Sequence, residues 1–140
     1  MKYYLGTNIC IYFLKGLFPE LPKKMLSMSP DDIKIPSIVE AELLYGAVKS
    51  MKSEENRENV KRFLLPFENM PFDDKAVACY SVIRNSLEST GNIIGPNDLI
   101  IAATVLAHEG ILITNNEKEF KRVAGLKVEN WLDSPDVHTK

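Results

Sequence analysis

The chain has 140 residues, of which 45% are hydrophobic and 26% are charged, and its formal net charge is -2. This composition is typical of a single globular domain and excludes a mainly disordered protein. The charge balance neither favours nor excludes a nucleic-acid partner, because an acidic metal site would offset basic residues elsewhere on the surface. We expect one domain over residues 1–132 and a short C-terminal tail over residues 133–140.

Two further observations concern the compartment. No window reaches the roughly 20 consecutive apolar residues of a membrane span. The two cysteines, Cys10 and Cys79, lie in apolar segments and lack the spacing of a metal site or a redox pair. We therefore expect free thiols in a reducing compartment, a cytoplasmic protein and no membrane partner.

Apolar runs alternate with helical segments along the chain. The sequence predicts strands at residues 2–6, 33–36, 67–70, 111–114 and 126–129. It predicts helices at about 8–15, 19–27, 38–50, 53–65, from a cap at Asp73 to about 89, and at 96–109, with a short helix that begins at Asn116. This alternation is typical of the α/β class, with a central, mainly parallel β-sheet flanked by helices on both faces.

The first strand ends at Gly6, and Thr7 and Asn8 begin the helix that follows it. In open α/β proteins the junction between a strand and the next helix is where functional groups gather. A glycine suits a turn at this position. It also leaves the tip of the strand without a side chain, so this junction is either a simple turn or a site that lacks one group.

Two glutamates begin the helix predicted at 38–50. Ser37 and Glu40 have the spacing of a capping box, so we expect them to cap this helix. Glu42 lies one turn further on, among apolar residues, and has no such local role. A carboxylate there needs a cation, hydrogen-bond donors or an exit to solvent. This segment alone favours a solvated or salt-bridged Glu42, because glutamates are mostly exposed.

Asp98 begins a helix that is apolar on nearly every side, which indicates a central, buried helix. An aspartate in a first helical turn is often explained by capping or by the helix dipole. The depth of this helix favours a second explanation, in which Asp98 lies at the floor of a cleft.

A further pair, Asn116 and Glu119, follows the strand predicted at 111–114. Its spacing predicts that Asn116 caps the short helix and that Glu119 completes the cap. Four segments, 6–8, 37–42, 95–98 and 114–119, thus place polar groups beside strand ends or helix starts. Together they predict an acidic pocket at the carboxyl edge of the sheet, where Mg²⁺ or Mn²⁺ is the natural occupant because hard cations prefer oxygen ligands.

Other chemistries find no support in the sequence. There is no histidine cluster for zinc. There is also no Ser-His-Asp set, Walker loop or GxGxxG segment, which argues against acyl transfer, P-loop nucleotide hydrolysis and dinucleotide binding.

Five stretches carry a resemblance to a known family: YLGTNICIY at 4–12, AELLYG at 41–46, GPNDLIIAA at 95–103, TNNEKEF at 114–120 and VENW at 128–131. They resemble PIN-domain ribonucleases of the VapC toxin type, and they cover nearly the whole chain in the family's order. The resemblance implies a Mg²⁺- or Mn²⁺-dependent endoribonuclease that forms a homodimer. It also implies a VapB-type antitoxin, whose C-terminal segment reaches into the active-site groove, and an RNA substrate that in one branch is initiator tRNA.

The resemblance assigns roles to particular residues. Glu42 matches the family's invariant glutamate and Asp98 its central aspartate, both expected as catalytic metal ligands. Asn116 stands where many members have aspartate, and Glu119 is the nearest acid, so both are candidate catalytic residues. Four residues are expected to support the ligands from behind: Thr7, Asn8, Ser37 and Thr114.

The first stretch departs from the family pattern at position 6. The pattern is Leu-Asp-Thr-Asn, whereas this chain has Leu5-Gly6-Thr7-Asn8. Gly6 therefore replaces an expected catalytic, metal-binding aspartate, and we expect impaired cleavage. The sequence leaves open whether this change is natural or engineered. It also leaves two alternatives: a catalytically inactive PIN-domain protein that dimerises and captures antitoxin or RNA, and a generic α/β domain whose acids are caps and surface charges.

Overall fold

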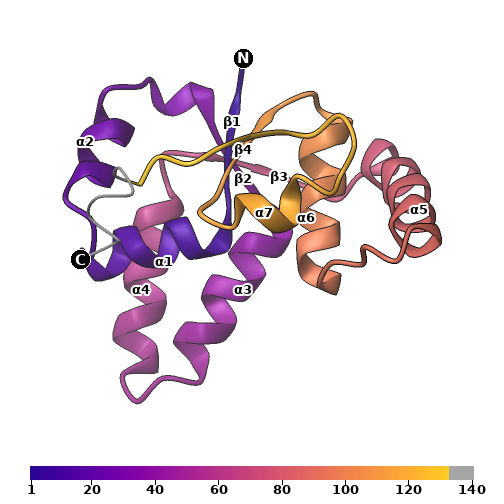
Figure 1. The fold of residues 1–140 in the computed structure, drawn as a ribbon. Coiled ribbons are helices and arrows are strands. Elements are labelled where there is room, and N and C mark those ends of the chain that lie inside the picture. The colour runs from indigo at the N-terminus through magenta and orange to yellow at the C-terminus, as the bar shows by residue number, and fades with distance from the viewer. Residues whose placement is uncertain (133–140) are drawn as a thin grey trace, which may run out of the picture.

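A computed structural model of the chain describes residues 1–132 (Figure 1). The tail predicted at 133–140 lies outside the described residues. Five short strands form one sheet, in the order β3-β2-β1-β4-β5, and every neighbouring pair is parallel. The strands are β1 (Tyr3–Leu5), β2 (Ile33–Pro36), β3 (Glu68–Met70), β4 (Ile111–Ile113) and β5 (Lys127–Glu129). The predicted parallel sheet is confirmed.

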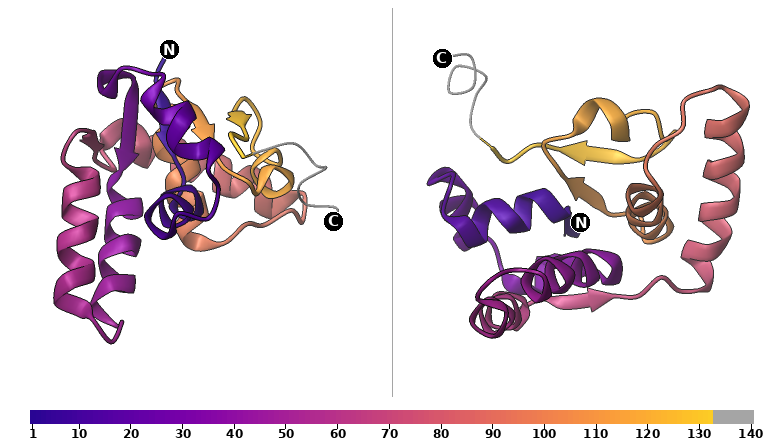
Figure 2. Two further views of the ribbon diagram at one scale, coloured as in Figure 1. Left: turned by 90° about the vertical axis from the view of Figure 1, so that its left-hand side faces the viewer. Right: turned by 90° about the horizontal axis from the view of Figure 1, so that it is seen from below.

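Helices lie on both sides of this sheet, as predicted (Figure 2). They are α1 (Thr7–Lys15), α2 (Glu20–Leu26), α3 (Ser37–Val48), α4 (Ser53–Leu64), α5 (Asp74–Ser89), α6 (Pro96–Ala107) and α7 (Glu117–Phe120). A short 3₁₀ helix, η1 (Pro30–Asp32), was not predicted. In Figure 1, α3 and α4 form a hairpin that projects beyond the sheet, and α5 packs beside α6.

One part of the core lies between the central strands and α6, and buried residues of the other helices complete it. Leu5, Leu112 and Ile113 are fully buried on the middle strands β1 and β4. On α6 the run from Ile101 to Val105 is buried without interruption, which confirms the central helix predicted from its apolar circumference. This packing fixes the first turn of α6 relative to the ends of β1 and β4, because a close-packed interior resists displacement.

The strand order creates a switch point at β1. The chain leaves β1 for β2 on one side, whereas β4 lies on the other side. In open α/β sheets, ligands bind outside the carboxyl ends of the strands at such a point. Gly6 directly follows β1 and Thr114 directly follows β4. The fold therefore places the two strand ends that sequence analysis identified side by side.

Two predicted helix caps have different outcomes. Asp73 caps α5 as predicted, because its Oδ1 accepts a hydrogen bond of 3.0 Å from the backbone N–H of Ala76. The predicted capping box at α3 is wrong. Ser37 is already the first residue of the helix and forms no cap. Its hydroxyl instead donates to the side chain of Asn69 at the edge of β3.

Within the part of the chain that the structure describes, no helix has the length and apolar character that a membrane crossing requires.

The turn between α6 and β4 yields a stability prediction. A Cβ added to Gly110 would lie 2.3 Å and 2.4 Å from two ring carbons of Tyr4, whose side chain is buried. Gly110→Ala should therefore lower the free energy of unfolding by about 1–3 kcal/mol, the usual cost of overpacking. Urea unfolding measures this value. The control is Gly46→Ala inside α3, where an added Cβ meets no atom within 4 Å. That variant should gain up to about 1 kcal/mol from helix propensity. Equal effects of the two substitutions would contradict the packing at Tyr4.

Candidate active site

Gly6 has an ordinary backbone conformation. Its φ of -75° and ψ of 163° are extended and open to any residue. Its N–H donates a 2.9 Å hydrogen bond to the carbonyl of Ile113. A Cβ at this position would lie 3.1 Å from the same carbonyl oxygen and 3.8 Å from the Cβ of Thr114. The backbone therefore does not require glycine, and a side chain fits after a shift of a few tenths of an ångström.

Glu42 is held by two neutral donors from other helices. The hydroxyl of Thr7 on α1 donates to Oε1, and Nδ2 of Asn97 on α6 donates to Oε2 over 3.1 Å. Among the described residues, no cation forms an ion pair with Glu42. The salt bridge that its segment alone would permit is therefore absent from this part of the chain. Thr7 lies where sequence analysis placed it, behind Glu42, whereas the role of Asn97 was missed.

Asp98 and Glu119 form a hydrogen-bonded acid pair. Burial, the hydrogen bond to Glu119 and the charges of Glu119 and Glu42 together raise the pKa of Asp98 to about 7. Burial also acts to raise the pKa of Glu119. Hydrogen bonds from Asn116, Asp98 and the backbone of Gly95 outweigh it, so this pKa is lowered. The contact between the two carboxyls thus acts to raise the pKa of Asp98 and to lower that of Glu119.

The surroundings of Glu119 correct a second predicted cap. Asn116 precedes α7 but makes no side-chain cap. Its Nδ2 donates over 2.8 Å to Oε2 of Glu119, while Oε1 accepts from the backbone N–H of Gly95 over 3.2 Å. The hydroxyl oxygen of the buried Thr114 accepts from the backbone N–H of Asn116 over 3.0 Å. One oxygen of Glu119 thus contacts the side chain of Asn116 at the start of its own helix, and the other contacts the backbone at the start of α6.

Two residues expected to support the ligands lie elsewhere. The side chain of Asn8 is exposed and has no hydrogen bond to any other described residue. Ser37 donates to Asn69, whose own amide donates to Glu40 over 2.7 Å. Neither contacts Glu42 or Asp98. The structure therefore brings together Glu42, Asp98, Asn116, Glu119, Thr7 and Thr114 near the end of β1.

The fit of a divalent cation depends on how many acids converge. The carboxylate oxygens of Glu42, Asp98 and Glu119 are suitable donors for Mg²⁺ or Mn²⁺. Within residues 1–132, however, no group of three His, Cys, Asp or Glu side chains is close enough together to hold a metal ion. The residues present have the right chemistry but do not form a metal site. Gly6, at the end of β1 beside Thr114 at the end of β4, has no side chain that could serve as a metal ligand.

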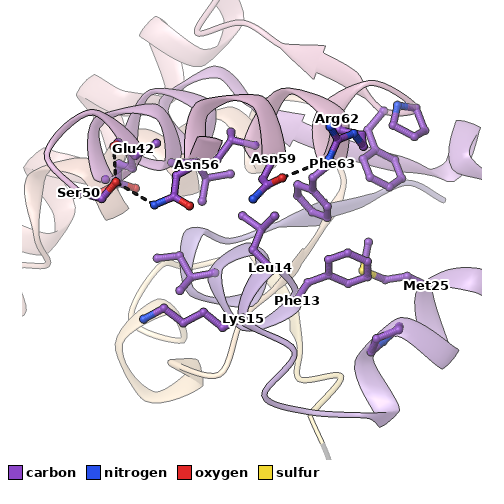
Figure 3. A pocket seen from close by; sticks show the side chains of 18 of the residues that line it. Phe13, Leu14, Lys15, Met25, Glu42, Ser50, Asn56, Asn59, Arg62 and Phe63 are labelled. Atoms are coloured by element: carbon purple, nitrogen blue, oxygen red, sulfur yellow. Dashed lines mark hydrogen bonds between the residues drawn. The ribbon is translucent and has the colours of Figure 1, made fainter. Parts of the chain in front are cut away.

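Glu42 also lines a large apolar groove of about 1080 Å³. The groove lies between α1, α2, α3 and α4 (Figure 3), and Figure 3 shows Phe13 and Leu14 of α1 facing Phe63 of α4 across it. Three cations also line it: Lys15, Lys49 and Arg62. None of these three forms an ion pair with another described residue. The groove is therefore an apolar surface with three cations that form no ion pair among the described residues and with Glu42 of the acidic site in its lining.

Known proteins share this fold and sequence. The sequence pattern of the PIN domain family matches residues 3–126. Ribonuclease VapC2 from Rickettsia felis is 43% identical over 94% of this chain and 98% of its own length. The tRNA(fMet)-specific endonuclease VapC from Salmonella typhimurium is 34% identical over the same shares.

Solved structures agree with these relatives. The crystal structure of VapBC2 from Rickettsia felis, bound to a DNA fragment from its promoter, contains a chain with a TM-score of 0.89 and 42% identity. The DNA-bound VapBC from Salmonella typhimurium also has a TM-score of 0.89, at 32% identity. Each match covers 94% of this chain and 98% or more of the other. The chain therefore belongs to the PIN domain family and, within it, to the VapC proteins.

Proposed function

We propose that this chain is the toxin of a VapBC-type toxin–antitoxin system, built as an endoribonuclease whose catalytic site is incomplete at Gly6. The observation that carries the proposal is the gathering of Glu42, Asp98 and Glu119 at the switch point of a VapC fold. The names of the relatives support ribonuclease chemistry, and one of them is specific for tRNA(fMet). We therefore propose RNA as the substrate class, with initiator tRNA as the first candidate.

Hydrogen bonds in this chain orient the acidic side chains of the proposed site, but the described acids are too few to bind a metal ion by themselves. Thr7 and Asn97 orient Glu42 by donating to both of its oxygens. Glu119 holds Asp98 through a shared proton. We propose Mg²⁺ or Mn²⁺ as the cofactor of the family's full carboxylate set, where the cation supplies positive charge at the phosphate. In this chain the set lacks the acid at position 6, and the described acids do not form a metal site.

That shortage also favours the alternative of a binding protein that does not cleave. The fold, the groove and the hydrogen bonds around Glu42 do not need a side chain at position 6. Capture of a partner can therefore persist where catalysis does not.

We further propose that the groove receives a segment of a VapB-type antitoxin. Its apolar floor suits the apolar face of an amphipathic segment, and its three unpaired cations favour acidic residues along the rim. Glu42, at the acidic side, would attract a basic side chain from the same segment. Both solved relatives described above are VapBC complexes, which supports this partner.

Restoring the missing acid tests the enzyme. Gly6→Asp should raise Mg²⁺- or Mn²⁺-dependent cleavage of a total tRNA pool by about two orders of magnitude, the scale on which one charge-stabilising group affects an active site. Gly6→Asn is the matched control, because it has the same shape without the charge. Sequencing of the cleaved ends identifies the RNA that is cut, and a chelator should abolish the gain. Equal rates for the unchanged chain and for Gly6→Asp would contradict impairment at position 6. Absence of cleavage by both would favour the binding protein.

The charge of Asp98 predicts how stability changes with pH. Its pKa of about 7 in the fold exceeds the ordinary value of 3.8, so folding keeps a proton that the unfolded chain loses between about pH 4 and pH 7. Stability from this group is therefore highest at the acid end and falls as pH rises through that window. Asp98→Asn should remove this fall and raise the free energy of unfolding at pH 8 by about 1 kcal/mol, allowing for screening of a half-exposed group.

Thermal unfolding of both proteins from pH 5 to pH 8 measures this difference. Asp74→Asn removes an exposed acid from the first turn of α5 and serves as the control. It should leave the pH dependence unchanged. A difference between Asp98→Asn and the parent chain that stays constant with pH would refute the raised pKa.

A bulky residue at Gly46 tests the groove. This glycine lines the groove, and a Cβ added there meets no atom within 4 Å, so Gly46→Phe should fill the groove without disturbing α3. We expect binding of the cognate antitoxin to weaken at least about tenfold by calorimetry, while the melting temperature matches that of Gly46→Ala. Unchanged affinity would place the antitoxin elsewhere.

Light scattering on the same samples tests the implied homodimer: a mass near twice 15.8 kDa supports it, and 15.8 kDa contradicts it.

A further inference from the structure

The segment that precedes α6 is held by a different part of the chain. Residues 92–95 have no regular secondary structure, yet they lead directly into the helix that carries Asn97 and Asp98. Gly95 occupies the N-cap position of α6 and provides no side-chain cap. Contacts that hold residues 92–95 in place therefore also hold the first turn of α6 in place.

Two side chains, one in α7 and one just after it, hydrogen-bond to the backbone of this segment. A guanidinium nitrogen of Arg122, Nη1, donates over 2.9 Å to the carbonyl of Ile93. The carboxylate of Glu119 accepts over 3.2 Å from the N–H of Gly95. Residues two apart in an extended segment present their polar backbone groups to the same side. Residues three apart in a helical turn also share a side, so one turn can hold both groups.

Arg122 also acts on the acid pair itself. Hydrogen bonds from Asn116, Asp98 and the backbone of Gly95 lower the pKa of Glu119 against the effect of burial, and the charge of Arg122 adds a smaller contribution in the same direction. The backbone N–H of Arg122 donates over 3.1 Å to the carbonyl of Glu119, so the two residues move as one unit. Within the described residues, the guanidinium of Arg122 forms no hydrogen bond with a carboxylate of the site.

We propose that Arg122 is a positioning residue: with Glu119 it clamps residues 93–95 and thereby sets the places of Asn97 and Asp98 relative to Glu42. The clamp contacts backbone groups only, so it sets the position of the segment whatever side chains the segment carries. Loss of the contact at Ile93 frees the segment on one side. It then loosens the donor that Asn97 presents to Glu42 and the hydrogen bond between Asp98 and Glu119.

The first test needs no cleavage and uses the full chain. Arg122→Ala should speed amide hydrogen exchange at Gly95 and Leu99 about tenfold, because one hydrogen bond to a charged group is lost there. The N–H of Leu99 bonds the carbonyl of Gly95, so it reports on the first turn of α6. Lys121→Ala is the matched control: it removes the neighbouring cation, whose ion pair with Glu117 stays within its own turn. Arg122→Lys should recover part of the protection, since it keeps a charged donor without the planar fork.

The second test rests on the proposed function and uses the Gly6→Asp background. There Arg122→Ala should lower kcat about tenfold at nearly constant KM, whereas Lys121→Ala should change neither, and Arg122→Lys should fall between them. Exchange at Gly95 and Leu99 that is the same in Arg122→Ala and Lys121→Ala would overturn the proposal. So would faster exchange spread evenly over the whole chain, which indicates general destabilisation. If Gly6→Asp itself does not cleave RNA, the proposed function fails, and the exchange comparison alone still decides the role of Arg122.

Discussion

The site depends on negative charge that the described residues leave without a positive partner. At the carboxyl edge of the sheet, burial, the hydrogen bond to Glu119 and the charges of Glu119 and Glu42 raise the pKa of Asp98 to about 7. Burial disfavours ionised carboxylates, and adjacent like charges disfavour them further. The fold tolerates this arrangement because strands β1 and β4 and helix α6 form a buried, close-packed centre that fixes where these acids stand.

Neutral groups and backbone donors orient the acids in place of cations. Glu42 receives a hydroxyl and an amide, and Glu119 receives an amide and a backbone N–H. Such donors fix the direction of a carboxylate while leaving its charge available to attract a ligand, whereas a lysine or arginine pair would neutralise it. The guanidinium of Arg122 donates to the backbone carbonyl of Ile93 and forms no ion pair with these carboxylates in the part of the chain that the structure describes. The directions of these carboxylates are therefore set by the protein's own hydrogen bonds.

Much of this architecture follows from local pattern. Alternating apolar runs and helices predicted the parallel sheet, and the uninterrupted apolar run after Asp98 predicted the buried helix, because both signals repeat over many residues. The failures share one cause. The Ser37–Glu40 and Asn116–Glu119 spacings are right for caps, but the distant Asn69 holds Ser37 and Glu40, and Glu119 accepts from the distant backbone of Gly95 as well as from Asn116. Asn97 was missed for the same reason, since its amide gains a role only when α6 lies beside Glu42.

The backbone conformation at Gly6 does not explain why a glycine is found there. A glycine at a strand end is ordinarily explained by a backbone that other residues cannot adopt. Here the backbone is extended, and among the described residues the nearest atom to an added Cβ is the carbonyl oxygen of Ile113 at 3.1 Å, so the backbone conformation gives no reason for glycine. The absence of a side chain at position 6 is therefore not imposed by the backbone. The donors to Glu42 and the residues that line the groove beside it do not include Gly6, so a substitution at position 6 changes the end of β1 without altering either set of contacts.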